Sequence, residues 1–222
     1  MTLVASSAAI HDLRHVIRDG IMFGMQYLHP ISEDAMVAVF LKTELASARF
    51  GPPILAILQR DGQEPQIIDQ PDLTNPADNA YRRQVLGEWR GYQRDADVFK
   101  DFPPDVRWYR AVATIADLAQ LRYINDDYWI ELSGGSRLVT DAVARIRQGI
   151  EAFQVSNAGF WYMVEALCAG AVFPELILVG KDERSPLVVL EGHVRLTAYL
   201  LRPNCVPTTV PVLVGYAPQM EK

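Results

Sequence analysis

The residues best suited to chemistry lie in one short stretch near the C-terminus, Glu191-Gly192-His193-Val194-Arg195. It follows an apolar run with the length of a buried strand, and apolar positions at helical spacing come after it. The first N–H groups of a helix have no internal partner and bind phosphate well. Gly192 lets a ligand approach the backbone, and Arg195 can offer a planar fork of donors. The pattern therefore predicts a phosphate site with Gly192, His193 and Arg195 as binding residues.

Glu191 and His193 flank this turn and are the candidates for moving a proton. No set of metal ligands is predicted around them. Strand–glycine–helix turns also occur without any ligand, so a purely structural turn is the alternative interpretation.

The stretch from Glu191 to Ala198, Glu-Gly-His-Val-Arg-Leu-Thr-Ala, resembles the Gly-x-x-Arg-x-x-Ala box of the ParB-like and sulfiredoxin-like superfamily. In that superfamily the box follows a strand, opens a helix and cradles the phosphates of a nucleotide. The resemblance covers the C-terminal half of the chain only. It implies a nucleoside triphosphate or diphosphate (ATP, ADP or CTP) as ligand, with Mg²⁺ if the protein is catalytic.

The differences from known members narrow the expected function. Sulfiredoxins place a cysteine before the histidine of the box, where this chain has Gly192. Partition proteins add a helix-turn-helix DNA reader after the box, and too few residues follow Leu201 for that module. The box of the free-serine kinases is nearest in form. We therefore expect a nucleotide-binding protein that transfers phosphate or hydrolyses the nucleotide; the alternative is a non-catalytic binding or interaction module that retains the fold.

A second loop rich in donors lies at Ser133-Gly134-Gly135-Ser136-Arg137. It precedes a predicted helix, and in the ParB-like pattern an arginine-bearing loop commonly stands in this position. The resemblance therefore implies that Ser136 and Arg137 contact the same ligand.

The order of elements in residues 106–222 agrees with the resemblance. It is typical of a small mixed sheet packed against helices, which is an α+β fold. The patterns predict strands at 108–114, 173–179, 187–190 and 210–215, and helices at 115–121, 140–149, 157–169 and 193–201.

Residues 1–101 are predicted to form a mainly helical region of unknown role. Pro103 and Pro104 place the boundary between this region and the nucleotide-binding domain at 106–222. Helices are expected at 7–28, from Ser32 to about Ala48 and at 79–92. Between the last two, residues 54–59 and 66–69 are predicted to form a β-hairpin around Asp61-Gly62. Arginines at positions 82, 83, 90 and 94 are expected to form a solvated face; a phosphate or nucleic-acid surface is the alternative.

Composition limits the partners and the compartment. The chain has 222 residues, half of them hydrophobic, and a formal net charge of −6, which argues against nucleic-acid binding. Two cysteines, Cys168 and Cys205, form no C-x-x-C pair, so neither a disulfide framework nor a zinc site is expected. No stretch predicts a signal peptide or a membrane span. We expect a cytoplasmic protein, with a homo-oligomer or a protein partner contacting the N-terminal region.

Overall fold

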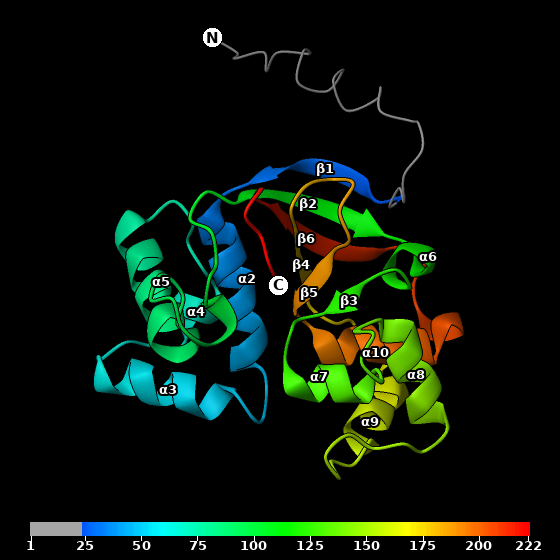
Figure 1. Ribbon diagram of the computed structural model, residues 1–222. Helices are drawn as coiled ribbons and strands as arrows, with labels where there is room; N and C mark the ends of the chain where they lie inside the picture. Colours follow the sequence, from blue (N-terminus) through cyan, green and yellow to red (C-terminus); the bar gives the residue numbers. More distant parts are fainter. Residues whose placement is uncertain (1–23) are drawn as a thin grey trace.

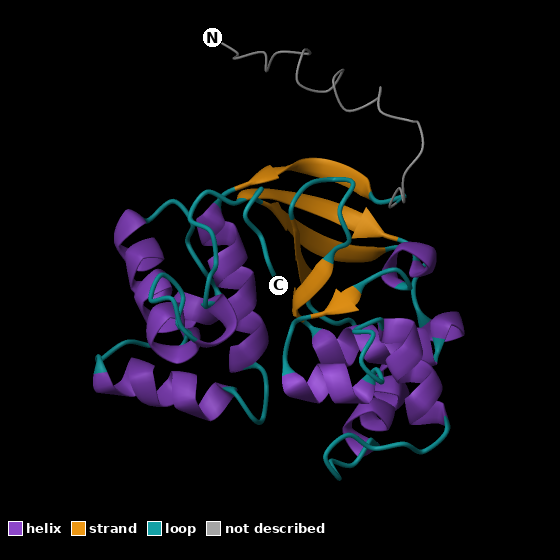
Figure 2. Ribbon diagram, viewed as in Figure 1, coloured by secondary structure: helices purple, strands orange, loops and turns teal. Residues whose placement is uncertain are grey.

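A six-stranded mixed sheet lies at the centre of the computed structural model, which describes residues 24–222. Helices cover both faces of the sheet (Figures 1 and 2). The strand order is β1-β2-β6-β4-β5-β3. The strands are β1 (Gln26–Ile31), β2 (Arg107–Ala113), β3 (Arg122–Tyr123), β4 (Leu176–Gly180), β5 (Val188–Glu191) and β6 (Val210–Tyr216). The predicted α+β class is confirmed, and its ParB-like topology stays a prediction.

The helices form two groups that pack on opposite faces of the sheet. The first group is α2 (Glu33–Leu45), α3 (Gly51–Arg60), α4 (Gln66–Asp69) and α5 (Pro76–Arg90). The second is α6 (Ile115–Leu118), α7 (Asp127–Leu132), α8 (Val139–Arg147), α9 (Ala158–Cys168) and α10 (His193–Leu201). Figure 1 shows the first group in blue and cyan, apart from the second in green to orange.

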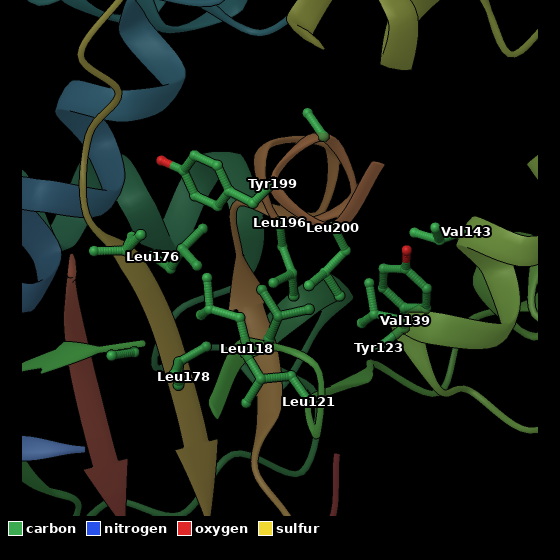
Figure 3. Packing of buried hydrophobic residues seen from close by; sticks show 14 of the residues in the cluster. Leu118, Leu121, Tyr123, Val139, Val143, Leu176, Leu178, Leu196, Tyr199 and Leu200 are labelled. Atoms are coloured by element: carbon green, nitrogen blue, oxygen red, sulfur yellow. The ribbon is translucent and has the colours of Figure 1, made fainter. Parts of the chain in front are cut away.

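Strand β4 shows why the sheet needs cover on both sides. It is buried along its whole length, and its side chains alternate between the two hydrophobic clusters. Leu176 and Leu178 face the second helical group, where Leu196, Tyr199 and Leu200 of α10 pack near them (Figure 3). Ile177 and Val179 face the first group. An apolar run without alternation is typical of a strand buried on both faces.

The N-terminal region contains no hairpin at residues 54–69, and that prediction was wrong. Residues 51–60 form helix α3, and residues 66–69 form α4. Pro52 and Pro53 stand in the first turn of α3, where a missing N–H costs nothing. Ile54, Ile57 and Leu58 then fall at helical spacing and are buried. The Asp61-Gly62 turn therefore joins two helices.

Other N-terminal predictions had mixed outcomes. The helix capped by Ser32 is confirmed as α2, because the Ser32 side chain accepts a hydrogen bond from the Ala35 N–H. The helix expected at 79–92 is confirmed as α5, with Asn75 as its cap. The helix expected at 7–28 falls mostly outside the described residues, and its last residues belong to β1 instead.

The two parts of the chain share the hydrophobic cluster on one face of the sheet. Strand β1 precedes the predicted boundary at residues 102–105 and pairs with β2, which follows it. Phe40 of α2 lies in the same cluster as Ile177 and Leu213 of the sheet. The first helical group therefore covers a face of the sheet that would otherwise expose apolar side chains to water.

The arginines of α5 do not form the solvated face that the sequence predicts. Arg82 is fully buried and donates to the Ile67 carbonyl at 2.8 Å and the Asp72 carbonyl at 2.9 Å. Arg83 pairs with Asp34 of α2. These contacts satisfy buried backbone carbonyls and tie α5 to its neighbours.

Cys168 and Cys205 form a disulfide, with their Cα atoms 5.0 Å apart. The expectation that the chain carries no disulfide was therefore wrong. The bond joins the end of α9 to the segment that follows α10, which are 37 residues apart in sequence. Within residues 24–222, no helix has both the length and the apolar character needed to cross a membrane. A cytoplasmic location stays a prediction, and structural disulfides are more common in oxidising compartments.

Candidate functional site

The turn at the end of β5 has the predicted strand–glycine–helix form. β5 ends at Glu191, and α10 begins at His193. Gly192 adopts φ 102° and ψ 22°, a left-handed conformation that favours glycine. Within residues 24–222, no side chain caps the N-terminus of α10. The first N–H groups of α10 are therefore left for another partner.

Arg195 is held inside the protein by two contacts. Its side chain is largely buried, and its Nη1 lies 3.5 Å from the Glu191 Oε1 atom. Its Nη2 donates to the Glu175 carbonyl at 3.1 Å, whereas its buried Nε has no hydrogen-bond partner in the described part of the chain. The predicted fork of donors is thus engaged by groups of the protein itself.

The space beside Gly192 is filled. A Cβ atom added there would lie 2.5 Å from the Leu176 Cδ2 atom and 2.9 Å from the Arg195 Nη2 atom. The absence of a side chain at Gly192 therefore lets Leu176 and Arg195 pack against the backbone. The sequence predicts that a ligand enters this space, whereas here Leu176 and Arg195 occupy it.

His193 is a neutral imidazole packed against a pair of stacked aromatic rings, Trp129 and Tyr123. Its ring stacks on Trp129 with centroids 4.8 Å apart, and Tyr123 stacks at 6.1 Å. Burial lowers the pKa of His193 to about 3, and the positive charges of Arg195 and Arg90 lower it further. Its Nε2 is buried and has no hydrogen-bond partner among the described residues. A buried polar atom of this kind needs an explanation, and a bound ligand is one.

Glu191 is also in an environment that disfavours charge. Burial raises the pKa of the Glu191 carboxyl group, while the Arg195 guanidinium opposes that shift. The nearby Glu44 carboxylate raises the pKa of Glu191 further. A carboxyl group with a raised pKa in a buried polar site is suited to proton transfer.

Glu44 and Arg90 both lie close enough to Glu191 to shift its pKa, and with Glu191 and Arg195 they form a polar cluster. Neither residue is predicted as a site residue from the sequence. The Arg90 Nε atom donates to both carboxylate oxygens of Glu44, at 2.9 and 3.1 Å. Glu44 is almost fully buried in the last turn of α2, and Trp89 also donates to it. One signal was available: Glu44 follows Phe40 by four residues, so a carboxylate lies on the apolar face of its helix.

Ser136 and Arg137 lie apart from the turn. The Arg137 Nε and Nη2 atoms donate to the Tyr123 carbonyl at 2.9 and 2.7 Å. The Ser136 hydroxyl donates to the Ser133 carbonyl at 3.2 Å. Among the described residues, no hydrogen bond or ion pair joins either side chain to residues 191–195. The prediction that they contact the same ligand as the turn remains without a supporting contact.

Potential metal ligands do not gather at the turn. In the described part of the chain, no group of three or more His, Cys, Asp or Glu residues could hold a metal ion. At the turn itself, Glu191 is the carboxylate that could contact a nucleotide-bound cation.

The chain matches no model of a known protein family, no curated protein and no solved structure. The resemblance of residues 191–198 to the ParB-like box therefore stays a prediction.

Proposed function

We propose that the protein binds the phosphate groups of a nucleotide at the turn formed by residues 191–195. The observation that carries this proposal is the unpartnered, buried Nε2 atom of His193 at the uncapped N-terminus of α10. A neutral imidazole can donate one hydrogen bond from a ring nitrogen. The N–H groups of the first helical turn add donors, and the helix dipole favours a negative ligand.

The pairing of Arg195 with Glu191 supports the same proposal in a second way. In the ionised state Glu191 neutralises Arg195, because their side chains are paired at the turn. Burial raises the pKa of Glu191, so the carboxyl group takes up a proton more readily than an exposed one. Protonation of Glu191 would free the guanidinium to attract a phosphate. Arg195 would then supply charge from within the protein.

If the protein turns the nucleotide over, Glu191 is the residue that would accept or deliver the proton. The established requirements of phosphoryl transfer are positioning and charge stabilisation, with Mg²⁺ neutralising the phosphates. Mg²⁺ usually keeps several waters and binds through one or two carboxylates plus the phosphates. In its ionised form, Glu191 would make that contact. Whether the chemistry is transfer to an acceptor or hydrolysis depends on a substrate that these residues do not specify.

The alternative is a non-catalytic binding or interaction module in which the turn is structural. Two observations favour it: Arg195 already contacts Glu191 and the Glu175 carbonyl, and Leu176 fills the space beside Gly192. In that case the polar cluster of Glu44, Arg90, Glu191 and Arg195 joins the first helical group to the turn. A partner for residues 1–101, either a second copy or another protein, is a further proposal that fits either function.

Nucleotide binding is tested by thermal denaturation of the full chain with ATP, ADP, CTP and GTP, each with and without Mg²⁺. A ligand that binds the native state stabilises it, by about 2.7 kcal/mol when the ligand is at a hundredfold excess over Kd, and so raises the melting temperature. We expect at least one nucleotide to raise it. Release of inorganic phosphate from the same samples separates an enzyme from a binding module. No rise with any nucleotide would leave only the structural turn.

A further inference from the structure

A separate pocket lies at the opposite end of β5 from the turn. Strand β5 pairs with β4 so that Val188 faces Val179 at its start and Glu191 faces Ile177 at its end. The pocket is at the start of β5, beside Val179 and Val188, and has a volume of about 410 Å³. Its lining includes no residue from 191 to 195. Cavities of this size hold small organic ligands.

The lining of this pocket combines an apolar wall with cationic and polar side chains. Val179, Pro186, Val188 and Met220 form the apolar part. The cationic and polar part includes Arg137, Lys181, Asn125 and Ser185. Such a lining suits a ligand with an apolar body and one anionic group.

Arg137 is a cation at this pocket that no carboxylate among the described residues pairs with. It forms no ion pair with any residue from 24 to 222, and its Nη1 atom makes no hydrogen bond there. Its other contacts are with a backbone carbonyl, that of Tyr123. Burial lowers the pKa of Arg137, and the nearby charge of Arg122 lowers it further. A partly desolvated cation without a carboxylate partner is stabilised by an anionic ligand.

The charged side chains of the lining are positive in sum, because Arg137, Lys181 and Lys222 stand against Glu221 alone. Lys181 lies 3.5 Å from Glu221, and both side chains are more than half exposed, so that pairing is weak. Lys222 donates to the Lys100 carbonyl, away from the Lys181 pair. Glu221 is the acidic residue of the lining and competes with a ligand for Lys181.

We propose that this pocket binds a small organic anion, held through a phosphate or carboxylate group by Arg137 and Lys181. Its apolar body would lie against Val179 and Val188. The Arg137 Nη1 atom would donate to the anionic group while Nε and Nη2 keep their bonds to the Tyr123 carbonyl. This site is independent of the nucleotide proposed at the turn, because the two use different ends of β5 and share no residue.

The test is calorimetric titration of the full chain with phenyl phosphate, benzoate and the neutral analogue benzyl alcohol. We expect wild-type protein to bind at least one of the anions and not benzyl alcohol, and the stronger anion identifies the preferred group. Lys181→Ala should weaken that binding about tenfold, since it removes one charge-assisted contact. Arg137→Gln should weaken it at least as much, whereas Glu221→Gln should strengthen it by removing the competing carboxylate.

Lys42→Ala is the matched control. Lys42 lies on α2, is about as exposed as Lys181, and its Nζ atom pairs with Asp69 of α4 at 3.7 Å. This variant should leave binding unchanged. If Arg137→Gln does not fold, Lys181→Ala and Glu221→Gln still decide the outcome. The proposal is overturned if neither anion binds wild-type protein, or if Lys181→Ala binds as tightly as Lys42→Ala.

Discussion

Replacing Gly192 with alanine should lower the free energy of unfolding by about 2–6 kcal/mol, measured by urea denaturation. Two costs add at this position. A non-glycine residue at φ 102° is strained by about 1–3 kcal/mol. The new Cβ atom would also lie 2.5 Å from Leu176 and 2.9 Å from Arg195, and overpacking of this kind costs about 1–3 kcal/mol.

Two other glycines separate these costs. Gly62 has φ +67° and open space where its Cβ would stand, so Gly62→Ala should cost only the strain, about 1–2 kcal/mol. Gly159 lies within α9, with no atom close to its Cβ position, and Gly159→Ala should stabilise by about 0.5–1 kcal/mol. If Gly192→Ala costs no more than Gly62→Ala, then Leu176 and Arg195 do not crowd the turn.

Removal of the disulfide should lower the free energy of unfolding by about 2–4 kcal/mol. Cys168 and Cys205 are separated by 37 residues, and the bond restricts the unfolded chain over that loop. It also fastens the segment after α10 to the end of α9. The comparison is between wild-type protein and the Cys168→Ser variant in urea, without reducing agent.

Reducing agent provides the control for this prediction. It should bring wild-type protein to the stability of Cys168→Ser, and it should leave the double variant Cys168→Ser, Cys205→Ser unchanged. A wild-type unfolding midpoint that is the same with and without reducing agent would show that the two sulfurs are not bonded in solution.

Local patterns predicted most elements of the C-terminal half, but not the short strand β3 or helix α7. The apolar run before Glu191 and the helical spacing after His193 are local signals, and β5 and α10 begin and end close to the expected residues. Residues 54–59 failed because a short apolar stretch between turns fits either a strand or a helix. The first helical group, packed on one face of the sheet, settles the choice for α3. Edge strand β1 was missed because its residues continue an apolar helical pattern.

The candidate site was predicted only as far as it is continuous in sequence. Glu191, Gly192, His193 and Arg195 lie next to one another, so their spacing predicts the turn. Glu44 and Arg90 reach the same cluster from α2 and α5, and only the packing of the first helical group places them there. The disulfide was missed for the same reason, because its cysteines meet through the packing of α9 against α10.

The central claim is that the turn at residues 191–195 binds nucleotide phosphate. Its most direct test compares the affinity of Arg195→Ala and wild-type protein for the nucleotide that stabilises wild type most, with the melting temperature measured on the same samples. Arg147→Ala is the matched control, because Arg147, like Arg195, donates to backbone carbonyls of the protein. Its Nη2 atom contacts the Leu200 and Leu201 carbonyls at the other end of α10, at 3.1 Å each.

We expect Arg195→Ala to bind the nucleotide about ten- to a hundredfold more weakly, since a charge-assisted hydrogen bond contributes about 1.5–3 kcal/mol. Arg195→Lys should recover part of the loss, because it restores the charge without the planar fork. Arg147→Ala should lower the melting temperature and leave the affinity unchanged. If folded Arg195→Ala binds the nucleotide as tightly as wild-type protein does, the turn is structural and the claim is wrong.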